Sequence, residues 1–326
     1  MNIPKVFLFC SERSGSNLIT KLLNAHSSIC GPSTKHLLNA SLRNLHRYQE
    51  INEEENWKDF VTHLMDLFHV DFSIWKSDFN SNELFDQVKQ GDIQGLFNYI
   101  FDKETQLNGK KVTFIKEIKI YEIYPFITRY FSNPRYIYLV RDPRDMALSW
   151  KKSKIHKGGV VTAAKQWKND QQQFLKCACL ENETNTIYSL KYEDLISHSE
   201  EKLKEVFSFL ELPYEDVQST FYKDETTVQN SEQNEAWRNL SGSIISDNSK
   251  KYLTELSSLE ISLVEKICGD EMTYFDFIKT NNQRDIQVVS MEKIGQIEKD
   301  DLNSLPYEPP IGVTENMKAK AQFYRR

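Results

Sequence analysis

Short apolar runs alternate with helical patterns along most of the chain. Runs rich in β-branched and aromatic residues predict buried strands at Lys5–Cys10, Lys111–Ile115, Arg135–Val140 and Thr186–Leu190. Helical spacing of apolar residues predicts helices at Asn17–His26, Trp57–Phe68, Ile93–Asp102, Glu122–Phe131, Pro143–Lys154, Ala163–Cys179 and Glu200–Leu210. Because strands that alternate with helices are usually parallel, the pattern predicts an α/β fold with a central, mostly parallel sheet flanked by helices.

Two segments interrupt this alternation. Residues 41–110 are polar and favour helices, so we expect a helical insertion that forms a lid on the substrate side. Residues 281–326 lose periodicity and contain "LPYEPPIGV", which predicts an extended C-terminal tail, wrapped on the body or disordered. The chain is therefore expected to form a single domain over residues 1–280, followed by the tail.

Composition excludes several classes of protein. A net charge of −6 over 326 residues argues against a general nucleic-acid binder. The five cysteines are odd in number and have no zinc-site spacing, which favours a reducing compartment. The sequence also has no apolar run of about 18 residues, the length of a membrane span. We expect a soluble, cytoplasmic protein.

Residues 11–18, "SERSGSNL", form a turn between the first predicted strand and a helix. Such a turn presents unpaired backbone N–H groups at the positive end of a helix dipole, where anions bind. Gly15 lets the backbone approach an anion, and further donors come from Arg13, Ser14, Ser16 and Asn17. The stretch lacks the lysine of a Walker loop. It predicts an anion site, and the alternative is an ordinary turn with a serine cap.

A second candidate anion site lies in residues 136–150, "YIYLVRDPRDMALSW". Asp142 and Pro143 are typical of a helix start, so Arg141 would lie at the carboxyl end of a strand, where α/β proteins bind ligands. Ser149 follows two turns into the helix, and an arginine and a hydroxyl at this spacing can hold one anion. Alternatively, Arg141 pairs with a neighbouring aspartate and Ser149 packs locally.

Together the two motifs resemble those of sulfotransferases that use 3′-phosphoadenosine 5′-phosphosulfate (PAPS), especially bacterial and Golgi-type enzymes. Residues 12–17 match the family's 5′-phosphosulfate loop, and Arg141 with Ser149 matches its 3′-phosphate motif. Residues 187–212 look like its Tyr-Glu-Asp-Leu segment, and residues 237–257 are similar to its C-terminal loop. The resemblance covers residues 4–278 in order and implies a P-loop-NTPase-like sulfotransferase fold.

The resemblance also implies roles for individual residues. Arg13 would stabilise the leaving oxygen, while the loop N–H groups, Ser14, Gly15, Ser16 and Asn17 would hold the 5′-phosphate. Arg141 and Ser149 would hold the 3′-phosphate, and Tyr192 would stack on the adenine or pack beside it. Lys251, or nearly as well Lys250, would close over the phosphates. The products would be 3′-phosphoadenosine 5′-phosphate (PAP) and a sulfated acceptor, with no metal involved.

A hydroxyl acceptor also needs a general base. Relatives carry a glutamate after the first helix, but the matching residues 29–38 contain no carboxylate, and His36 is the nearest suitable group. Its rival is Glu117 in "FIKEIK", where Lys116 or Lys119 could contact the sulfonate. The structural alternatives are a buried or surface histidine and a Glu117–lysine pair. We rank His36 first.

Other aromatic and histidine residues have simpler interpretations. His26 would interact with a helix C-terminus, His156 would border the acceptor cleft or serve structure, and at most one of Trp150, Trp167 and Trp237 would contact the acceptor. The acceptor would be a hydroxyl on a carbohydrate, glycolipid or small metabolite, and a homodimer is possible. The competing functions are a P-loop small-molecule kinase and a non-catalytic nucleotide-binding protein of the same fold.

Overall fold

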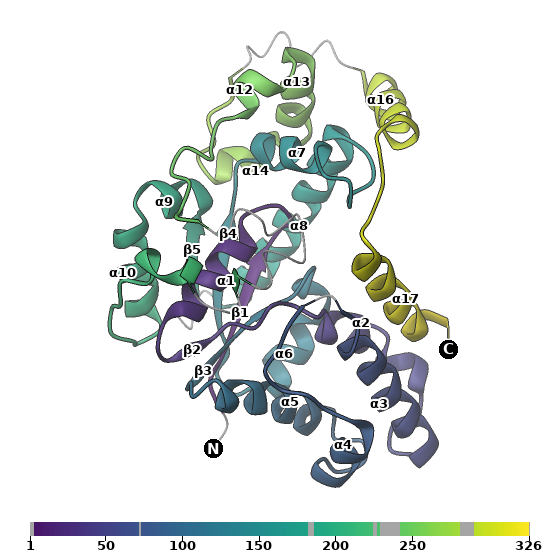
Figure 1. The fold of residues 1–326 in the computed structure, drawn as a ribbon. Helices are drawn as coiled ribbons and strands as arrows, with labels where there is room; N and C mark the ends of the chain where they lie inside the picture. Colours follow the sequence, from purple (N-terminus) through teal and green to yellow (C-terminus); the bar gives the residue numbers. More distant parts are fainter. Residues whose placement is uncertain are drawn as a thin grey trace.

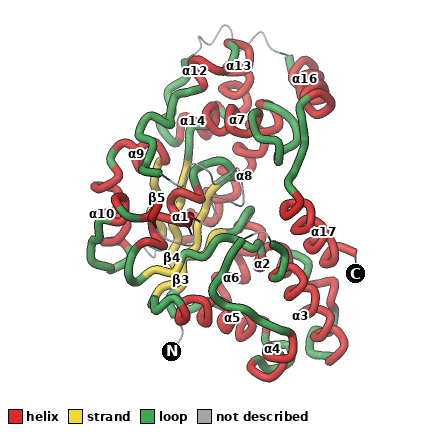
Figure 2. Tube along the Cα trace, in the orientation of Figure 1, coloured by secondary structure: helices red, strands yellow, loops and turns green. Residues whose placement is uncertain are grey.

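The computed structural model describes residues 3–71, 73–181, 186–223, 227–228, 242–280 and 290–325. Its centre is a five-stranded sheet of order β2-β3-β1-β4-β5, in which every pairing is parallel (Figures 1 and 2). The strands are β1 (Lys5–Cys10), β2 (Ile29–Cys30), β3 (Val112–Lys116), β4 (Arg135–Val140) and β5 (Ile187–Lys191). The predicted α/β class and the four predicted strands are confirmed, to within one residue at their ends. The two-residue strand β2 was not predicted.

Alternate residues of each strand point to opposite faces of the sheet, and each face has its own core. Val6 and Leu8 of β1 pack with the helices of one face, whereas Phe7 and Phe9 pack with those of the other. The first face is covered by α1 (Ser16–Ala25), α9 (Tyr192–Ser197) and α10 (Ser199–Phe209), with the short turns η3 (Val217–Ser219) and η4 (Phe221–Lys223). Burial on both faces explains why β1 is apolar throughout.

The second face carries the larger core and most of the helices. They are α2 (Leu37–Leu42), η1 (Leu45–Tyr48), α3 (Glu54–Phe68), α4 (Ser81–Gln87), α5 (Ile93–Leu107), η2 (Ile120–Ile123), α6 (Tyr124–Tyr130), α7 (Pro143–Lys151), α8 (Val160–Glu181), α12 (Tyr252–Glu255), α13 (Ser258–Ile267) and α14 (Gly269–Tyr274). The segment 41–110 is thus mostly helical, since it contains η1, α3, α4 and α5.

The expectation of an extended C-terminal tail is wrong for residues 291–325. They form the helices α16 (Met291–Ser304) and α17 (Ile311–Arg325), which pack on α8 and on α2 and α3 respectively (Figure 1). Ser290 caps α16 by accepting a hydrogen bond from the Lys293 N–H at 3.2 Å. Only the proline-containing link at 305–310 lacks helix, because proline interrupts the helical hydrogen-bond pattern.

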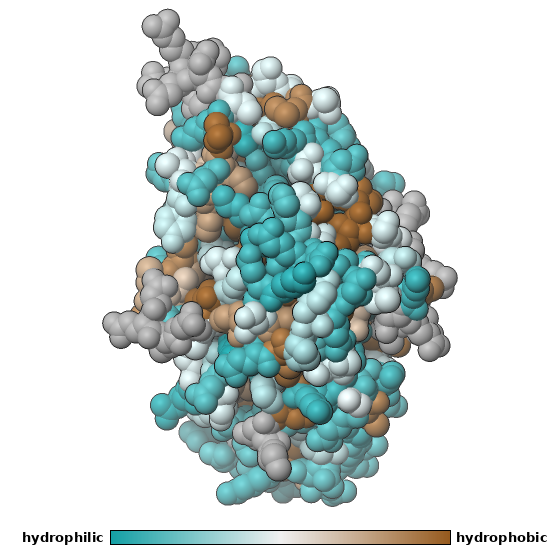
Figure 3. Space-filling model, turned by 90° about the vertical axis from the view of Figure 1, so that its left-hand side faces the viewer, coloured by the Kyte–Doolittle hydropathy of each residue, from teal (hydrophilic) through white to brown (hydrophobic). Residues whose placement is uncertain are grey.

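No helix among the described residues is both long and apolar enough to cross a bilayer. Hydrophilic residues dominate the face in Figure 3, and the apolar residues there form separate small patches.

Candidate active site

The candidate site lies at the carboxyl ends of three adjacent strands, β3, β1 and β4. In parallel α/β sheets this edge is where ligands bind. β1 leads through residues 11–15 into α1, and Gly15 at the helix start has a left-handed φ of 88°. The backbone therefore turns sharply at this position, and the N–H groups of the first turn of α1 face the loop.

Gly15 is required because an aromatic ring lies against it. A Cβ added at Gly15 would lie 2.3 Å from Cδ2 of Tyr192, far inside van der Waals contact. Tyr192 is only 5% exposed, and its hydroxyl accepts a hydrogen bond from Asn248 Nδ2 at 2.8 Å. The guanidinium of Arg141 lies 4.4 Å from the ring centroid. Tyr192 thus supports both the loop and Arg141.

The two sequence motifs meet in the fold. Arg13 Nε donates to Ser149 Oγ at 3.0 Å, which joins the β1–α1 loop to α7. Arg141 Nη1 donates to the Arg13 carbonyl at 3.0 Å. Its Nη2 donates to the Asn248 carbonyl at 3.1 Å. The predicted helix start is present, because the Asp142 side chain accepts the Arg144 N–H at 2.9 Å and Pro143 is the first residue of α7.

The arrangement favours an anion. Burial, followed by the neighbouring charge of Arg141, lowers the pKa of Arg13, so two close cations share this region. Ser14 Oγ and Arg141 Nε are buried and have no hydrogen-bond partner within the described parts of the chain. Such groups are costly unless a ligand or water satisfies them. Two arginines and an unpaired hydroxyl, beside a helix N-terminus, fit phosphate or sulfonate oxygens.

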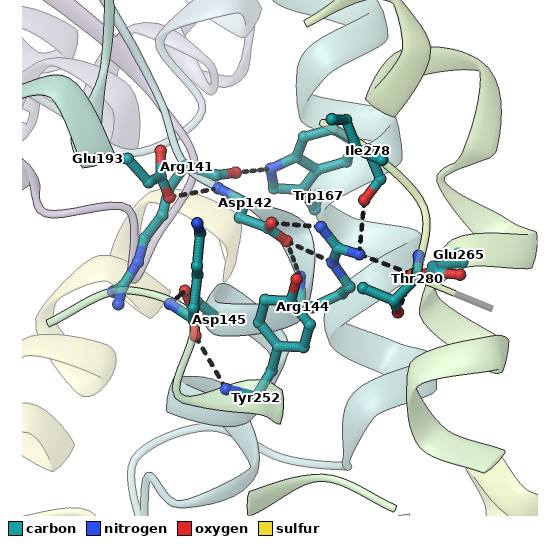
Figure 4. A network of polar contacts seen from close by, with 11 residues as sticks. Arg141, Asp142, Arg144, Asp145, Trp167, Glu193, Tyr252, Glu265, Ile278 and Thr280 are labelled. Carbon is teal, nitrogen blue, oxygen red and sulfur yellow. Dashed lines mark hydrogen bonds and ion pairs between the residues drawn. The ribbon is translucent and has the colours of Figure 1, made fainter. Parts of the chain in front are cut away.

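The segment before α12 is anchored to the same helix (Figure 4). The Asp145 carboxylate accepts the backbone N–H groups of Lys250, at 2.6 Å, and Tyr252, at 3.1 Å. Lys250 has a left-handed φ of 57°. The side chains of Lys250 and Lys251 are both exposed. The structure therefore holds the backbone of this segment close to α7 and leaves both predicted closing lysines in solvent.

A buried network fixes α7 beneath the site (Figure 4). Arg144 pairs with Asp142 at 2.6 Å and with Glu265 at 2.7 Å, and it lies 4.3 Å from the ring centroid of Tyr252. Trp167 is fully buried and donates through Nε1 to the Arg141 carbonyl at 3.0 Å. This tryptophan is therefore part of the core that positions Arg141.

The two candidate bases, His36 and Glu117, lie together. His36 precedes α2 with a left-handed φ of 61°, and Glu117 directly follows β3. The His36 Nδ1 and Glu117 Oε2 atoms are 3.7 Å apart, and Glu117 Oε1 accepts the Leu38 N–H at 3.2 Å. Glu117 is 3% exposed, and burial raises the pKa of its carboxyl. Burial, with the charges of Lys320 and Lys116, lowers the pKa of His36 well below its ordinary value.

A pocket of about 100 Å³ connects this pair to the phosphate loop. It is lined by Cys10, Ser11, Glu12, Arg13, Ser16, Asn17, Thr34, His36, Lys116, Glu117, Ile118, Ile155 and His156. Lys116 Nζ donates to Asn17 Oδ1, which brings a third cation to the loop, whereas Lys119 does not line the pocket. The pocket is thus lined both by cationic anion-binding groups and by the His36–Glu117 pair.

Glu12 is a pocket residue that the sequence interpretation left without a role. Its carboxylate lies 3.5 Å from His156 Nε2, while His156 Nδ1 is 2.9 Å from Ser153 Oγ. Burial, the largest single influence, acts to raise the pKa of Glu12, but His156 together with the charges of Lys320 and Lys116 outweighs it and the pKa is lowered. The ring of His156 packs on that of Trp150, with the centroids 4.2 Å apart. Glu12 and His156 line the pocket, and Trp150 supports His156 from behind without lining it.

The remaining candidates lie elsewhere. His26 is buried against Phe207 at 4.6 Å, and its Nε2 is 2.9 Å from the Pro213 carbonyl, away from the pocket. Trp237 lies outside the described residues. In the part of the chain that the structure describes, no three His, Cys, Asp or Glu side chains gather as metal ligands.

Comparison with known proteins agrees with this geometry. A family model described as "Sulfotransferase family" matches residues 4–216, more than half of the chain. The chain belongs to the sulfotransferase family.

Solved structures of sulfotransferase domains share the fold. The "Sulfotransferase Domain from the Curacin Biosynthetic Pathway" superposes with a TM-score of 0.57 at 20% identity, covering 83% of this chain and 98% of that one. The sulfotransferase domain of the Synechococcus PCC 7002 olefin synthase gives a TM-score of 0.51 at 17% identity, covering 81% and 94% of the two chains. No curated protein matches the sequence. The helix α17 lies beyond the residues that the family model matches.

Proposed function

We propose that this sulfotransferase moves a sulfuryl group from PAPS to a hydroxyl of a carbohydrate, glycolipid or small-metabolite acceptor. The observation that carries the proposal is the meeting of the two anion-binding motifs, with Arg13 Nε 3.0 Å from Ser149 Oγ and Arg141 bonded to the Arg13 carbonyl. A donor with phosphate groups at both its 5′ and 3′ positions needs two anion sites side by side. A nucleotide with phosphates only at its 5′ end does not.

The residues of the site fit such a donor. The N–H groups at the start of α1, with Ser14, Ser16 and Asn17, would hold the 5′-phosphate, and Arg141 with Ser149 would hold the 3′-phosphate. The buried and unpaired Ser14 Oγ and Arg141 Nε supply donors for these oxygens. Tyr192 would pack beside the adenine, because one side of its ring lies against Gly15 and Arg141 already stacks on it.

When bound, PAPS supplies an activated sulfuryl group whose S–O bond to the 5′-phosphate breaks as the acceptor oxygen attacks. Negative charge then grows on the departing phosphate oxygen, and Arg13 and Lys116 are the cations at the loop that would stabilise it. No metal ion is needed for this role, because guanidinium and ammonium groups supply the positive charge. The protein contributes orientation and fixed charge to the transfer.

His36 and Glu117 would remove the acceptor proton. We rank His36 first, with Glu117 3.7 Å away to stabilise the charge that the imidazole gains. Both groups line the same pocket as Arg13, which allows one acceptor hydroxyl to face the base and the sulfuryl group together. The lowered pKa of His36 keeps its ring neutral and able to accept a proton at pH 7.

The insertion at 41–110 would form the acceptor-side lid. Its residues touch the segment that leads to His36, because Trp75 Nε1 donates to the Ser33 carbonyl at 2.6 Å and Ser73 Oγ donates to the Thr34 carbonyl at 3.0 Å. Acceptor contacts in this insertion could therefore act directly on the position of His36.

A P-loop kinase is the alternative that the fold itself allows. Such an enzyme needs a loop lysine and carboxylates free to hold Mg²⁺. Asp142, the candidate carboxylate at the end of β4, is committed to capping α7 and pairing with Arg144. This commitment favours the sulfotransferase proposal.

The test is transfer of label from [³⁵S]PAPS to a panel of carbohydrates, lipids with free hydroxyls and phenols, with [γ-³²P]ATP–Mg²⁺ in parallel. We expect ³⁵S-labelled product, and we expect His36→Ala to lower turnover by roughly 100-fold or more while leaving PAP affinity nearly unchanged. His198→Ala, at an exposed histidine, is the matched control and should have no effect. Transfer of ³²P instead of ³⁵S would refute the proposal, and full turnover of His36→Ala would make Glu117 the base.

A further inference from the structure

The C-terminal helix α17 is docked by one buried face. Asn316, Ala319 and Phe323 recur at helical spacing, and all three are buried against the body. Phe323 is 0% exposed, and its ring centroid lies 6.2 Å from those of Tyr48 and Phe60. The helix packs on α2, α3 and η1, as Figure 1 shows at the right of the molecule.

This docking places one lysine on the packed side of α17. Lys320 lies on the docked face, between Ala319 and Phe323, and is half-buried. The helix α2, on which α17 packs, begins directly after His36, and Glu117 binds the N-terminal turn of α2. The docked face of α17 therefore packs on the helix that His36 precedes and whose first turn Glu117 binds.

The positive charge of Lys320 acts on the pKa values of the acidic and basic groups around the pair. Its ammonium acts to lower the pKa of His36, of Glu117 and of Glu12, while burial lowers the pKa of Lys320 itself. Lys116 at the end of β3 acts on His36 and Glu117 in the same direction. A nearby positive charge favours a carboxylate and disfavours an imidazolium. Both effects favour the proton-accepting form of the pair, while burial, the largest influence on Glu117, still raises the pKa of its carboxyl to about 7.

We propose that α17 completes the active site and that Lys320, on its docked face, is a positioning residue, which places a positive charge beside the His36–Glu117 pair so that the pair accepts the acceptor proton. The catalytic part of this inference rests on the proposed function of the pair. The electrostatic part concerns this chain alone and is measurable without donor or acceptor.

The experiment compares Lys320→Met with Lys320→Arg and with Lys318→Met. Methionine keeps the apolar stem without the charge, arginine restores the charge, and Lys318 is an exposed lysine on the same helix. Ring ¹⁵N signals of the histidines are followed by NMR over pH 4–9, and the His36 signal is assigned by its loss in His36→Asn. We expect the His36 pKa to rise by about one pH unit in Lys320→Met. It should stay unchanged in Lys320→Arg and Lys318→Met.

A second readout separates this inference from the proposed function. With the acceptor found by the ³⁵S assay, the acidic limb of the turnover profile should move to higher pH in Lys320→Met and return in Lys320→Arg. An unchanged His36 pKa in a folded Lys320→Met protein that still binds PAP would overturn the role of Lys320 and leave the sulfotransferase proposal intact. If the His36 pKa moves but the wild-type protein transfers no sulfate, the electrostatic part holds and the catalytic part fails.

Discussion

The packing of Tyr192 against Gly15 makes a quantitative prediction for Gly15→Ala. The new methyl group would meet the ring at 2.3 Å, at a residue whose φ is 88°. The left-handed backbone costs an alanine about 1–2 kcal/mol. Crowding in a packed site adds about 1–3 kcal/mol, and the stiffer unfolded chain returns about 0.4–1 kcal/mol. Stability should fall by about 3 kcal/mol.

Gly109→Ala is the matched control. Gly109 also has a left-handed φ, of 67°, but no atom lies within 4 Å of its added Cβ. Gly109→Ala carries only the cost of the left-handed backbone, so this variant should lose about 1 kcal/mol of stability. Urea unfolding of both variants, followed by circular dichroism, measures the difference. Equal losses at the two glycines would refute the argument that Tyr192 packs against the loop.

Three further substitutions test other contacts. Arg141→Ala should weaken binding of PAP by at least tenfold more than binding of AMP in calorimetry, since only PAP carries the 3′-phosphate, and equal losses would remove this role. Asp145→Ala frees the backbone N–H groups of Lys250 and Tyr252, so PAP should dissociate faster in stopped-flow measurements, whereas an unchanged rate would exclude a closing role for this segment. Phe323→Ala should cost about 3 kcal/mol in urea unfolding, and a loss below about 1 kcal/mol would contradict a docked α17.

Much of the fold could be predicted because its signals are local. β1 and β4 are short apolar runs buried on both faces, and Asp142-Pro143 is a typical helix start. The strand β2 has only two residues and owes its conformation to pairing with β3, so no local pattern indicates it. The helix α17 depends on Phe323 filling a space between α3 and η1, a contact that its weak apolar pattern does not reveal.

The site also contains residues that local sequence patterns predict and residues that they do not. The loop residues 13–17 and Arg141 with Ser149 could be found because their spacing follows from a strand, a turn and a helix. His36 and Glu117 looked like rivals, since the sequence does not show that β3 and α2 bring them within 3.7 Å. Glu12 and Lys320 have no sequence signal, because their importance comes only from the groups that the fold places around them.

The central claim is that the site binds a nucleotide phosphorylated at both its 3′ and 5′ positions. Calorimetric titration of the protein with PAP, AMP and ATP–Mg²⁺, side by side, tests this claim most directly. The account predicts that PAP binds at least tenfold more tightly than either of the others, which corresponds to about 1.4 kcal/mol. Preference for ATP–Mg²⁺, or no binding of PAP, would contradict it.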